Sequence, residues 1–402
     1  MKLACVHEHM STGVRVTTSH IPLAALFFFT VTPRALMLAL IPLEVFSRFG
    51  DARSVSILFF VASVFGVIGS LSIPKILRRV GAHGLFHLAA ACAVLAALLL
   101  YQSALGWFLS GMVAWVFSAV AFEISMNLYV MARVPRNQLS LFEPMRILFA
   151  VVGYALGPWL GVFLAENVAP YAPFVLTACV AGVAVVFFRL LGLATISAGP
   201  ASGLSSNPLA LIRHFFAQPR IRLAWIITLA RTAWWSTFFI NAPIYAVGIG
   251  MSKNEGGALV SIGVAMVFTV TLWAKLGRRY GFRWLCIGGF TATGLVSLLV
   301  PWAAQLGERA PLAGAALLIS AAFCAASLDA LGHMAFLRAV RPRERESMSG
   351  VYGTYRDAAQ LLPPAVFALA LTWAPLSAVF AISGVWMLVI AWYCRYLPQR
   401  LR

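Results

Sequence analysis

Length, composition and charge place this chain in a lipid bilayer rather than in water. Of its 402 residues, 61% are hydrophobic and only 10% are charged, and the mean hydropathy is +0.89. A soluble domain of this size with that composition would aggregate. One membrane crossing takes about 20 apolar helical residues, so the length predicts about twelve spans and leaves no room for a separate soluble enzyme.

The positive charge of the chain lies at helix ends. The formal net charge is +18, from 30 Lys and Arg against 12 Asp and Glu. In a soluble protein this excess would suggest nucleic acid, but here nearly all of it falls at the ends of alternate predicted spans. We therefore expect the bilayer and a small-molecule substrate as partners, and no nucleic acid.

The sequence offers no pattern for a cleaved leader, a metal or a cofactor. Residues 1–20 lack the apolar core and small-residue cleavage site of a secretory signal, so the first span is expected to stay in the protein. The six cysteines have no paired spacing, and the cluster His7-Glu8-His9-Met10 supplies too few ligands for a metal. We expect no metal and no cofactor.

Apolar runs between charged residues or Pro and Gly predict twelve spans in two sets of six. The first set falls near residues 22–46, 54–77, 84–103, 105–132, 142–165 and 171–193. The second set falls near residues 221–247, 256–276, 282–304, 310–337, 351–373 and 375–397.

Basic residues follow every second predicted span. They are Lys75, Arg78 and Arg79; Arg133 and Arg136; Arg213, Arg220 and Arg222; Lys275, Arg278, Arg279 and Arg283; Arg338, Arg341, Arg343 and Arg345; and Arg395, Arg400 and Arg402. Short loops rich in Lys and Arg stay in the cytoplasm. Both termini are therefore expected in the cytoplasm, in a multi-pass protein of a bacterial-type inner membrane.

One connection is long enough to join two helix bundles. The segment Ala194–Pro219 is rich in Ser, Gly and Pro and precedes an amphipathic stretch at Leu209–Phe216. We therefore predict an N-terminal bundle over residues 1–193, a cytoplasmic linker over 194–219 and a C-terminal bundle over 220–402.

The two halves share a repeat. The residues Arg78-Arg79-Val80-Gly81 after the second span recur as Arg278-Arg279-Tyr280-Gly281 after the eighth. Four further matches relate the halves: Arg34 with Arg231, Glu123 with Asp329, Pro135-Arg136 with Pro342-Arg343, and Arg146 with Arg356. Two related six-helix halves of the same orientation are typical of transporters that rock around a central site.

A glycine and proline pattern in the fifth span carries a family resemblance. Gly153-x-x-x-Gly157-Pro158-x-x-Gly161 resembles the antiporter motif of drug/proton exporters in the major facilitator superfamily, and the chain is identified as a member of that superfamily from Ile21 to Leu397. Small residues at this spacing also let any two membrane helices approach closely, so packing alone is a second interpretation. Packing does not require Pro158.

The loop after the second span resembles the cytoplasmic gating motif of the same superfamily. Arg79, Gly81 and His83 fit that motif, but Arg78 stands where the motif has an acid, and Arg278 makes the same departure in the second half. A gating salt bridge through that acid is therefore in doubt. The arginines at these positions are at least determinants of orientation.

Four charged residues fall near the middle of predicted spans, where a charge costs about 2.5–3.5 kcal/mol. They are Arg34, Glu123, Arg231 and Asp329, in spans one, four, seven and ten. In the superfamily these spans line the central cavity, so the resemblance implies that all four face the transport pathway. We expect the ion pairs Arg34–Glu123 and Arg231–Asp329, which serve either function or mutual neutralisation.

The charges suggest roles. Two arginines from opposite halves suit an anionic group of a substrate, and carboxylates in a low dielectric suit proton coupling unless an arginine holds them ionised. Asn127 and His333 lie one helical turn beyond Glu123 and Asp329.

The predicted substrate contacts are Arg34, Arg231, Asn127, Trp234, Asn241 and His333; Trp235 is a further aromatic candidate for the lining. Arg146 and Arg356, beside Glu143 and Asp357, either form an inner gate or reach the interface.

The sequence therefore predicts a monomeric secondary transporter. It would move a small organic solute, with an anion favoured by the arginines, by alternating access and with proton coupling. A drug/proton antiporter and an uncoupled facilitator are the alternatives. An embedded enzyme ranks last, because the sequence contains no G-x-S-x-G, H-E-x-x-H or phosphate-binding loop motif.

Overall fold

The structure is a computed structural model of the whole chain, and it describes residues 21–135, 138–193, 208–331, 334–341 and 344–397. Within these ranges the chain forms helices and short 3-10 turns, with no β-strand. The prediction of an all-α protein is confirmed for this part of the chain.

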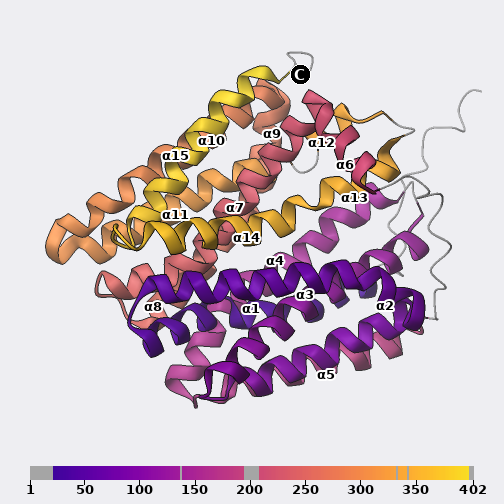
Figure 1. Cartoon of the computed structure of the whole chain (residues 1–402), viewed down its shortest axis with the longest axis horizontal. Coiled ribbons are helices and arrows are strands. Elements are labelled where there is room, and N and C mark those ends of the chain that lie inside the picture. Colours follow the sequence, from indigo (N-terminus) through magenta and orange to yellow (C-terminus); the bar gives the residue numbers. More distant parts are fainter. Residues whose placement is uncertain (1–20, 136–137, 194–207, 332–333, 342–343, 398–402) are drawn as a thin grey trace, which may run out of the picture.

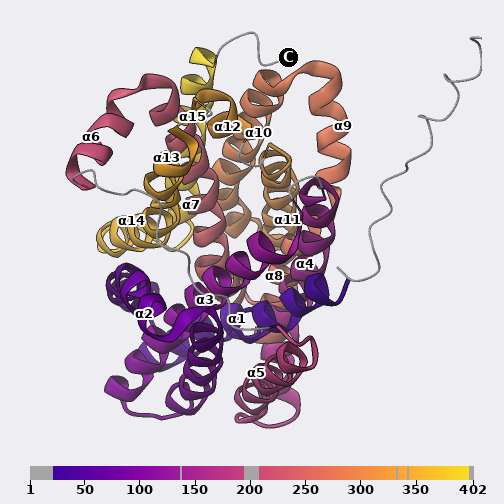
Figure 2. The same ribbon diagram turned by 90° about the vertical axis from the view of Figure 1, so that its right-hand side faces the viewer.

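The N-terminal helices lie together in the lower half of Figure 1 and again in the turned view of Figure 2. They are α1 (Ile21–Phe49), α2 (Ala52–Leu100), α3 (Leu105–Arg133), α4 (Leu139–Asn167) and α5 (Ala172–Leu190).

The later helices fill the upper half of both views, with α8 reaching down to the N-terminal helices. They are α6 (Pro208–Ala217), α7 (Pro219–Gly248), α8 (Lys253–Ala265), η2 (Met266–Thr269), α9 (Val270–Tyr280), α10 (Phe282–Ala303), η3 (Ala304–Arg309), α11 (Ala310–Asp329), α12 (Met334–Ala339), α13 (Arg345–Gly353), α14 (Tyr355–Ala370), α15 (Ala378–Tyr393) and η5 (Cys394–Tyr396). Helix α6 matches the amphipathic stretch predicted in the linker.

Nine helical stretches in the described ranges are long and apolar enough to cross a membrane. Two of them, Ala52–Leu100 and Phe282–Asp329, have 49 and 48 residues. Neither is one straight helix, because α2 is interrupted at Gly81 and the second stretch comprises α10, η3 and α11. At 1.5 Å per residue, the helical length summed along each stretch is about 70 Å, roughly twice the thickness of the hydrocarbon core. The chain is therefore a helical membrane protein with multiple spans.

Glycine breaks the helix after each copy of the repeated Arg-Arg pair. Gly81 interrupts α2 with φ 68° and ψ 177°, and Gly281 separates α9 from α10 with φ 94° and ψ 150°. Only glycine adopts this backbone region without strain, because a Cβ atom would collide with the backbone. The Arg-Arg-x-Gly repeat thus marks two equivalent sharp turns.

Alanine at either turn is expected to destabilise the protein by about 1–3 kcal/mol, the cost of holding a non-glycine residue in this backbone region. The midpoint of thermal unfolding in detergent would measure the loss for Gly81→Ala and Gly281→Ala. Gly182→Ala is the matched control, because Gly182 lies inside α5 with nothing within 4 Å of an added Cβ atom. Equal midpoints for all three variants would contradict the turn assignment.

The glycine motif of α4 packs that helix against α1. A Cβ atom at Gly157 would lie 2.5 Å from Cβ of Ala35, and one at Gly161 would lie 2.0 Å from the carbonyl oxygen of Leu36. Neither distance leaves room for a side chain. The packing interpretation of the motif therefore has a direct structural basis.

The opposite side of α4 approaches α8 across the boundary between the two sets of helices. A Cβ atom at Gly257 of α8 would lie 3.2 Å from the carbonyl oxygen of Pro158. The backbone N–H of Trp159 donates a hydrogen bond to Ser261 Oγ at 2.9 Å. Small residues on both helices thus bring α4 and α8 into close contact.

The two sets of helices share a core toward one end only. One buried hydrophobic cluster combines residues of α1–α4 with residues of α7, α8 and α10–α14. A second cluster contains residues 23–193 only, and it includes Ile73, Ala82 and Val134, which flank the basic ends of α2 and α3. The helices therefore join at the ends with few basic residues.

Polar contacts across the boundary agree with this picture. Lys253 Nζ lies 2.9 Å from Glu166 Oε1, between the N-terminal end of α8 and the C-terminal end of α4. Ser63 Oγ donates to the carbonyl oxygen of Gln360 at 3.1 Å, between α2 and α14.

Candidate functional site

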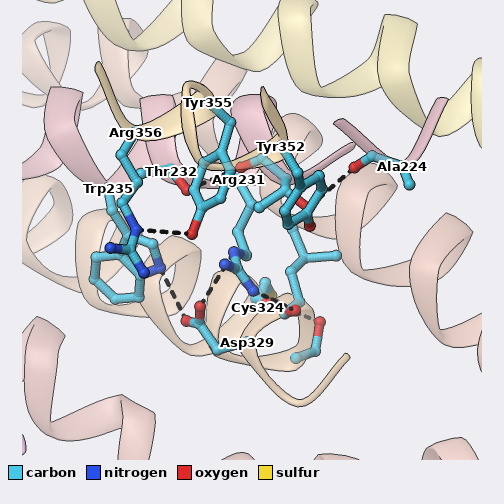
Figure 3. Close-up of polar contacts among 12 residues, drawn as sticks. Ala224, Arg231, Thr232, Trp235, Cys324, Asp329, Tyr352, Tyr355 and Arg356 are labelled. Carbon is cyan, nitrogen blue, oxygen red and sulfur yellow. Dashed lines mark hydrogen bonds and ion pairs between the residues drawn. The ribbon is translucent and has the colours of Figure 1, made fainter. Parts of the chain in front are cut away.

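Arg231 and Asp329 form the ion pair that the sequence predicts. Arg231 Nε of α7 lies 3.4 Å from Asp329 Oδ1, and the two side chains are 14% and 23% exposed (Figure 3). Asp329 is the last residue of α11, where the helix dipole disfavours a carboxylate. The positive charge of the Arg231 guanidinium offsets the unfavourable interaction of this carboxylate with the helix dipole. Arg231 Nη1 also donates to the carbonyl oxygen of Leu328, near the end of the same helix, at 3.4 Å.

The second oxygen of the same carboxylate is held by a tryptophan. Trp235 Nε1 donates to Asp329 Oδ2 at 2.9 Å. Trp235 follows Arg231 by one helical turn, so both side chains leave the same face of α7. The predicted contact Trp234 instead donates to Ser297 Oγ of α10 at 3.1 Å and is buried. The tryptophan at the charge pair is therefore Trp235.

Two tyrosines and a second arginine continue the polar cluster above the pair in Figure 3. The hydroxyls of Tyr352 on α13 and Thr228 on α7 are 2.6 Å apart. Arg356 Nε of α14 donates to the Tyr355 hydroxyl at 3.1 Å. The first contact ties α13 to α7, and the second, between neighbouring residues of α14, orients the Arg356 side chain.

Glu123 pairs with Arg356 rather than with Arg34. The Nη1 atom of Arg356 contacts Glu123 Oε1, and the two side chains are 46% and 39% exposed. The expected Arg34–Glu123 pair is not formed in this conformation. The ion pair instead crosses between α3 and α14, which belong to opposite ends of the sequence. Matching equivalent positions of the two halves does not find the Glu123–Arg356 pair, because its two residues occupy non-equivalent positions far apart in the sequence.

Arg34 forms no ion pair with another described residue, and its guanidinium carbon lies 5.8 Å from the ring centre of Trp115. It lines a cavity of about 240 Å³ between α1, α3 and α4. The other polar residues of this lining are Glu123, Arg146, Thr30 and Tyr154. An apolar cavity with a few converging polar groups is typical of a small-molecule site.

Arg146 also lines this cavity, and the sequence leaves open whether it forms an inner gate or reaches the membrane interface. Its Nη1 atom donates to Asn127 Oδ1 at 2.7 Å, and its Nη2 atom lies 2.7 Å from Glu143 Oε2. Its guanidinium also covers the ring of Phe27, at 5.0 Å. The predicted contact Asn127 therefore orients Arg146, and the repeat that pairs Arg146 with Arg356 is the signal that marks both as site residues.

The two remaining predicted contacts are Asn241 and His333. Asn241 is buried in α7, and its amide donates to the carbonyl oxygen of Thr237 at 3.1 Å. His333 lies outside the described residues. Among the described side chains, no three His, Cys, Asp or Glu residues gather as metal ligands.

The arginines of the repeated turns are exposed. Arg78 and Arg79 lie in α2 just before its interruption at Gly81, and Arg278 and Arg279 lie in the last turn of α9. None of the four forms an ion pair with a side chain that the structure describes. The departure from the gating motif noted in the sequence is thus matched by the lack of a gating salt bridge in this conformation.

No known family profile and no curated protein matches this sequence. Solved structures do match its fold. A POT family transporter in complex with 5-aminolevulinic acid superimposes with TM-score 0.76 and 13% identity, over 94% of this chain and 96% of that chain. The nucleoside transporter NupG gives TM-score 0.70 and 14% identity, over 94% and 98%.

A third match is the peptide transporter POT in complex with sulfate, with TM-score 0.75 and 12% identity over 95% of this chain and 94% of that chain. All three are transporters with the same architecture. The chain has the fold of a major facilitator superfamily transporter. The four charges predicted in mid-span lie on α1, α3, α7 and α11; Arg231 pairs with Asp329 among them, and Glu123 pairs with Arg356 of α14.

Proposed function

We propose that this chain is a secondary active transporter that moves a small organic anion across a bacterial-type inner membrane by alternating access, with proton coupling. One observation carries the proposal. Arg34 faces the 240 Å³ cavity without an ion pair among the described residues, while Glu123 in the same cavity is bound to Arg356 of the opposite half. A guanidinium without a counter-ion in an apolar cavity favours an anionic ligand.

The proposed architecture has twelve spans in two bundles. The two longest helical stretches each supply two crossings, and α13 with α14 supplies one more beyond the nine long stretches. The N-terminal bundle would cover residues 1–193, the linker 194–219 and the C-terminal bundle 220–402. The basic ends of the helices would face the cytoplasm, with both termini on that side.

In this topology the conformation is open toward the cytoplasm. The contacts between the bundles gather at the opposite end, where Lys253 meets Glu166 and the Trp159 N–H meets Ser261. Alternating access requires these contacts to break while the basic ends approach each other. A single exposed ion pair contributes at most about 1 kcal/mol, so breaking the Lys253–Glu166 pair adds little to the cost of this change.

The Glu123–Arg356 pair provides a way to couple substrate to proton. A substrate anion bound by Arg34 would compete with Glu123 for Arg356. A carboxylate released from its arginine in a low dielectric favours the protonated form. Substrate and proton would then bind together, which gives symport. The antiporter alternative draws on the glycine motif, whose residues pack α4 against α1 and α8.

Transport by purified protein in proteoliposomes tests the proposal. We expect an imposed pH gradient to drive accumulation of at least one small organic anion from a panel that includes carboxylates and organic phosphates. Cationic drugs and neutral nucleosides are the comparison set. Accumulation of cations against a proton gradient would favour antiport, and pH-independent equilibration would favour a facilitator. Either result would overturn the proposed symport of an anion.

Glu123→Gln is expected to lower gradient-driven accumulation by tenfold or more, equivalent to about 1.4 kcal/mol of coupling, while exchange of substrate across the membrane continues. The amide cannot exchange a proton with the cavity. Substrate affinity should rise as pH falls in the wild type and become independent of pH in the variant.

Glu44→Gln is the control for that measurement, since Glu44 pairs with Arg48 at an exposed helix end. Accumulation should be unchanged in this variant. A pH dependence that persists in Glu123→Gln would assign the coupling proton to another group and contradict this role for Glu123.

A further inference from the structure

A second cavity among the described residues lies away from the central charges. It has a volume of about 1190 Å³ and lies between α9, α10 and α11. Arg278, Arg279 and Arg283 line it, and no acidic residue does among those that the structure describes. A cavity of this size with three guanidinium groups on its wall is an electrostatic site for an anion.

Two buried hydrogen-bond donors in this cavity have no partner. They are Arg283 Nε and Trp273 Nε1, and neither bonds to a described residue. Buried polar groups in folded proteins almost always find a partner. Both donors belong to the lining of the same cavity, so an acceptor bound there would satisfy them together.

The rim and floor of the cavity suit a lipid. Tyr280 and Trp284 line it and are 60% and 68% exposed, and aromatic side chains of this kind gather at the membrane interface. Gly288, Gly289 and Ala292 of α10 form part of the wall without bulky side chains. A headgroup can enter between the helices while its chains remain in the bilayer.

Apolar side chains pack together in the corresponding region of the N-terminal half. Ala82, Leu85 and Phe86 follow Gly81 and are buried. Ser125 Oγ of α3 donates to the carbonyl oxygen of Ala82 at 2.9 Å, and the rings of Phe86 and Phe188 stack at 4.0 Å. The Arg-Arg-x-Gly repeat is present in both halves, so the repeat alone does not create the cavity.

We propose that the cavity between α9, α10 and α11 binds the phosphate group of an anionic phospholipid. Arg278, Arg279 and Arg283 would supply charge-assisted hydrogen bonds to the phosphate oxygens, and the free Arg283 and Trp273 N–H groups would be satisfied. Basic pockets between membrane helices are known sites for such headgroups. The exposed aromatic rim favours a lipid over a soluble phosphate.

Native mass spectrometry of the purified full-length protein tests this site with phosphatidylglycerol as the probe and phosphatidylcholine as the uncharged comparison. The variant Arg278→Gln/Arg279→Gln should lose phosphatidylglycerol affinity by about tenfold or more. The matched variant Arg78→Gln/Arg79→Gln removes the same charges from the N-terminal half and should retain phosphatidylglycerol affinity. Equal losses in both variants would show that only surface charge attracts the lipid, and would overturn the proposal.

A second variant keeps every arginine and fills the space. An added Cβ atom at Gly288 meets nothing within 4 Å, so Gly288→Trp should fold and displace the lipid, whereas Gly182→Trp in α5 should not. Retained lipid binding in Gly288→Trp would overturn the proposal.

Inorganic phosphate and glycerol 3-phosphate are the soluble competitors. Displacement of phosphatidylglycerol by either at comparable concentration would assign the site to a free phosphate compound instead. The readout requires no transport, so it stands apart from the transport function.

Discussion

Asp329→Ala is expected to destabilise the protein by about 3–5 kcal/mol, because it leaves the Arg231 guanidinium in a low-dielectric site without its carboxylate. Arg231 and Trp235 would each lose a carboxylate acceptor, since each contacts one oxygen of Asp329. Thermal unfolding in detergent would measure the loss. Glu44→Ala removes an acid from the more exposed pair with Arg48, and it should cost less than about 1 kcal/mol.

The double variant Arg231→Met/Asp329→Leu separates stability from function. Replacing a whole buried ion pair with apolar groups of similar volume is often neutral or stabilising. We therefore expect the double variant to unfold near the wild-type temperature but to transport no substrate. Full transport by the double variant would mean that the pair only neutralises itself, and it would remove Arg231 from the proposed site.

Gly161→Leu is expected to prevent the protein from folding into a stable monodisperse species. The first atom of the new side chain would lie 2.0 Å from the Leu36 carbonyl oxygen, so α1 and α4 would have to separate. Overpacking by side chains alone costs about 1–3 kcal/mol, and here the obstacle is backbone. Size-exclusion profiles and thermal unfolding of the purified variant would measure the effect.

Gly182→Leu is the control for this substitution, because the position in α5 is open and the variant should remain folded. The comparison also decides between the two interpretations of the glycine motif. A Gly161→Leu protein that folds normally but loses coupling would assign the motif to ion exchange rather than to helix packing. Loss of folding would assign it to packing.

The residue pairs show how far sequence reasoning reaches. Arg231 and Asp329 could be paired from the sequence, because two opposite charges at one depth in neighbouring inner helices must neutralise each other. The same reasoning paired Glu123 with Arg34, but the structure pairs it with Arg356. Similarly, the sequence singled out Trp234 for the site, although its neighbour Trp235 contacts Asp329. One residue along a helix turns a side chain by about 100°.

The sequence by itself determined the membrane class and the helical stretches, while the partner of each mid-span charge was decided by tertiary structure. The polarity of a bilayer changes only along the membrane normal, so the free-energy cost of burying a group depends on its depth. That depth can be counted in residues along a helix. The partners of Glu123, the contacts of Gly161 and the cavity lined by Arg283 depend on helix rotation and on how distant helices approach. Those relations join segments far apart in sequence, where periodicity and composition carry no information.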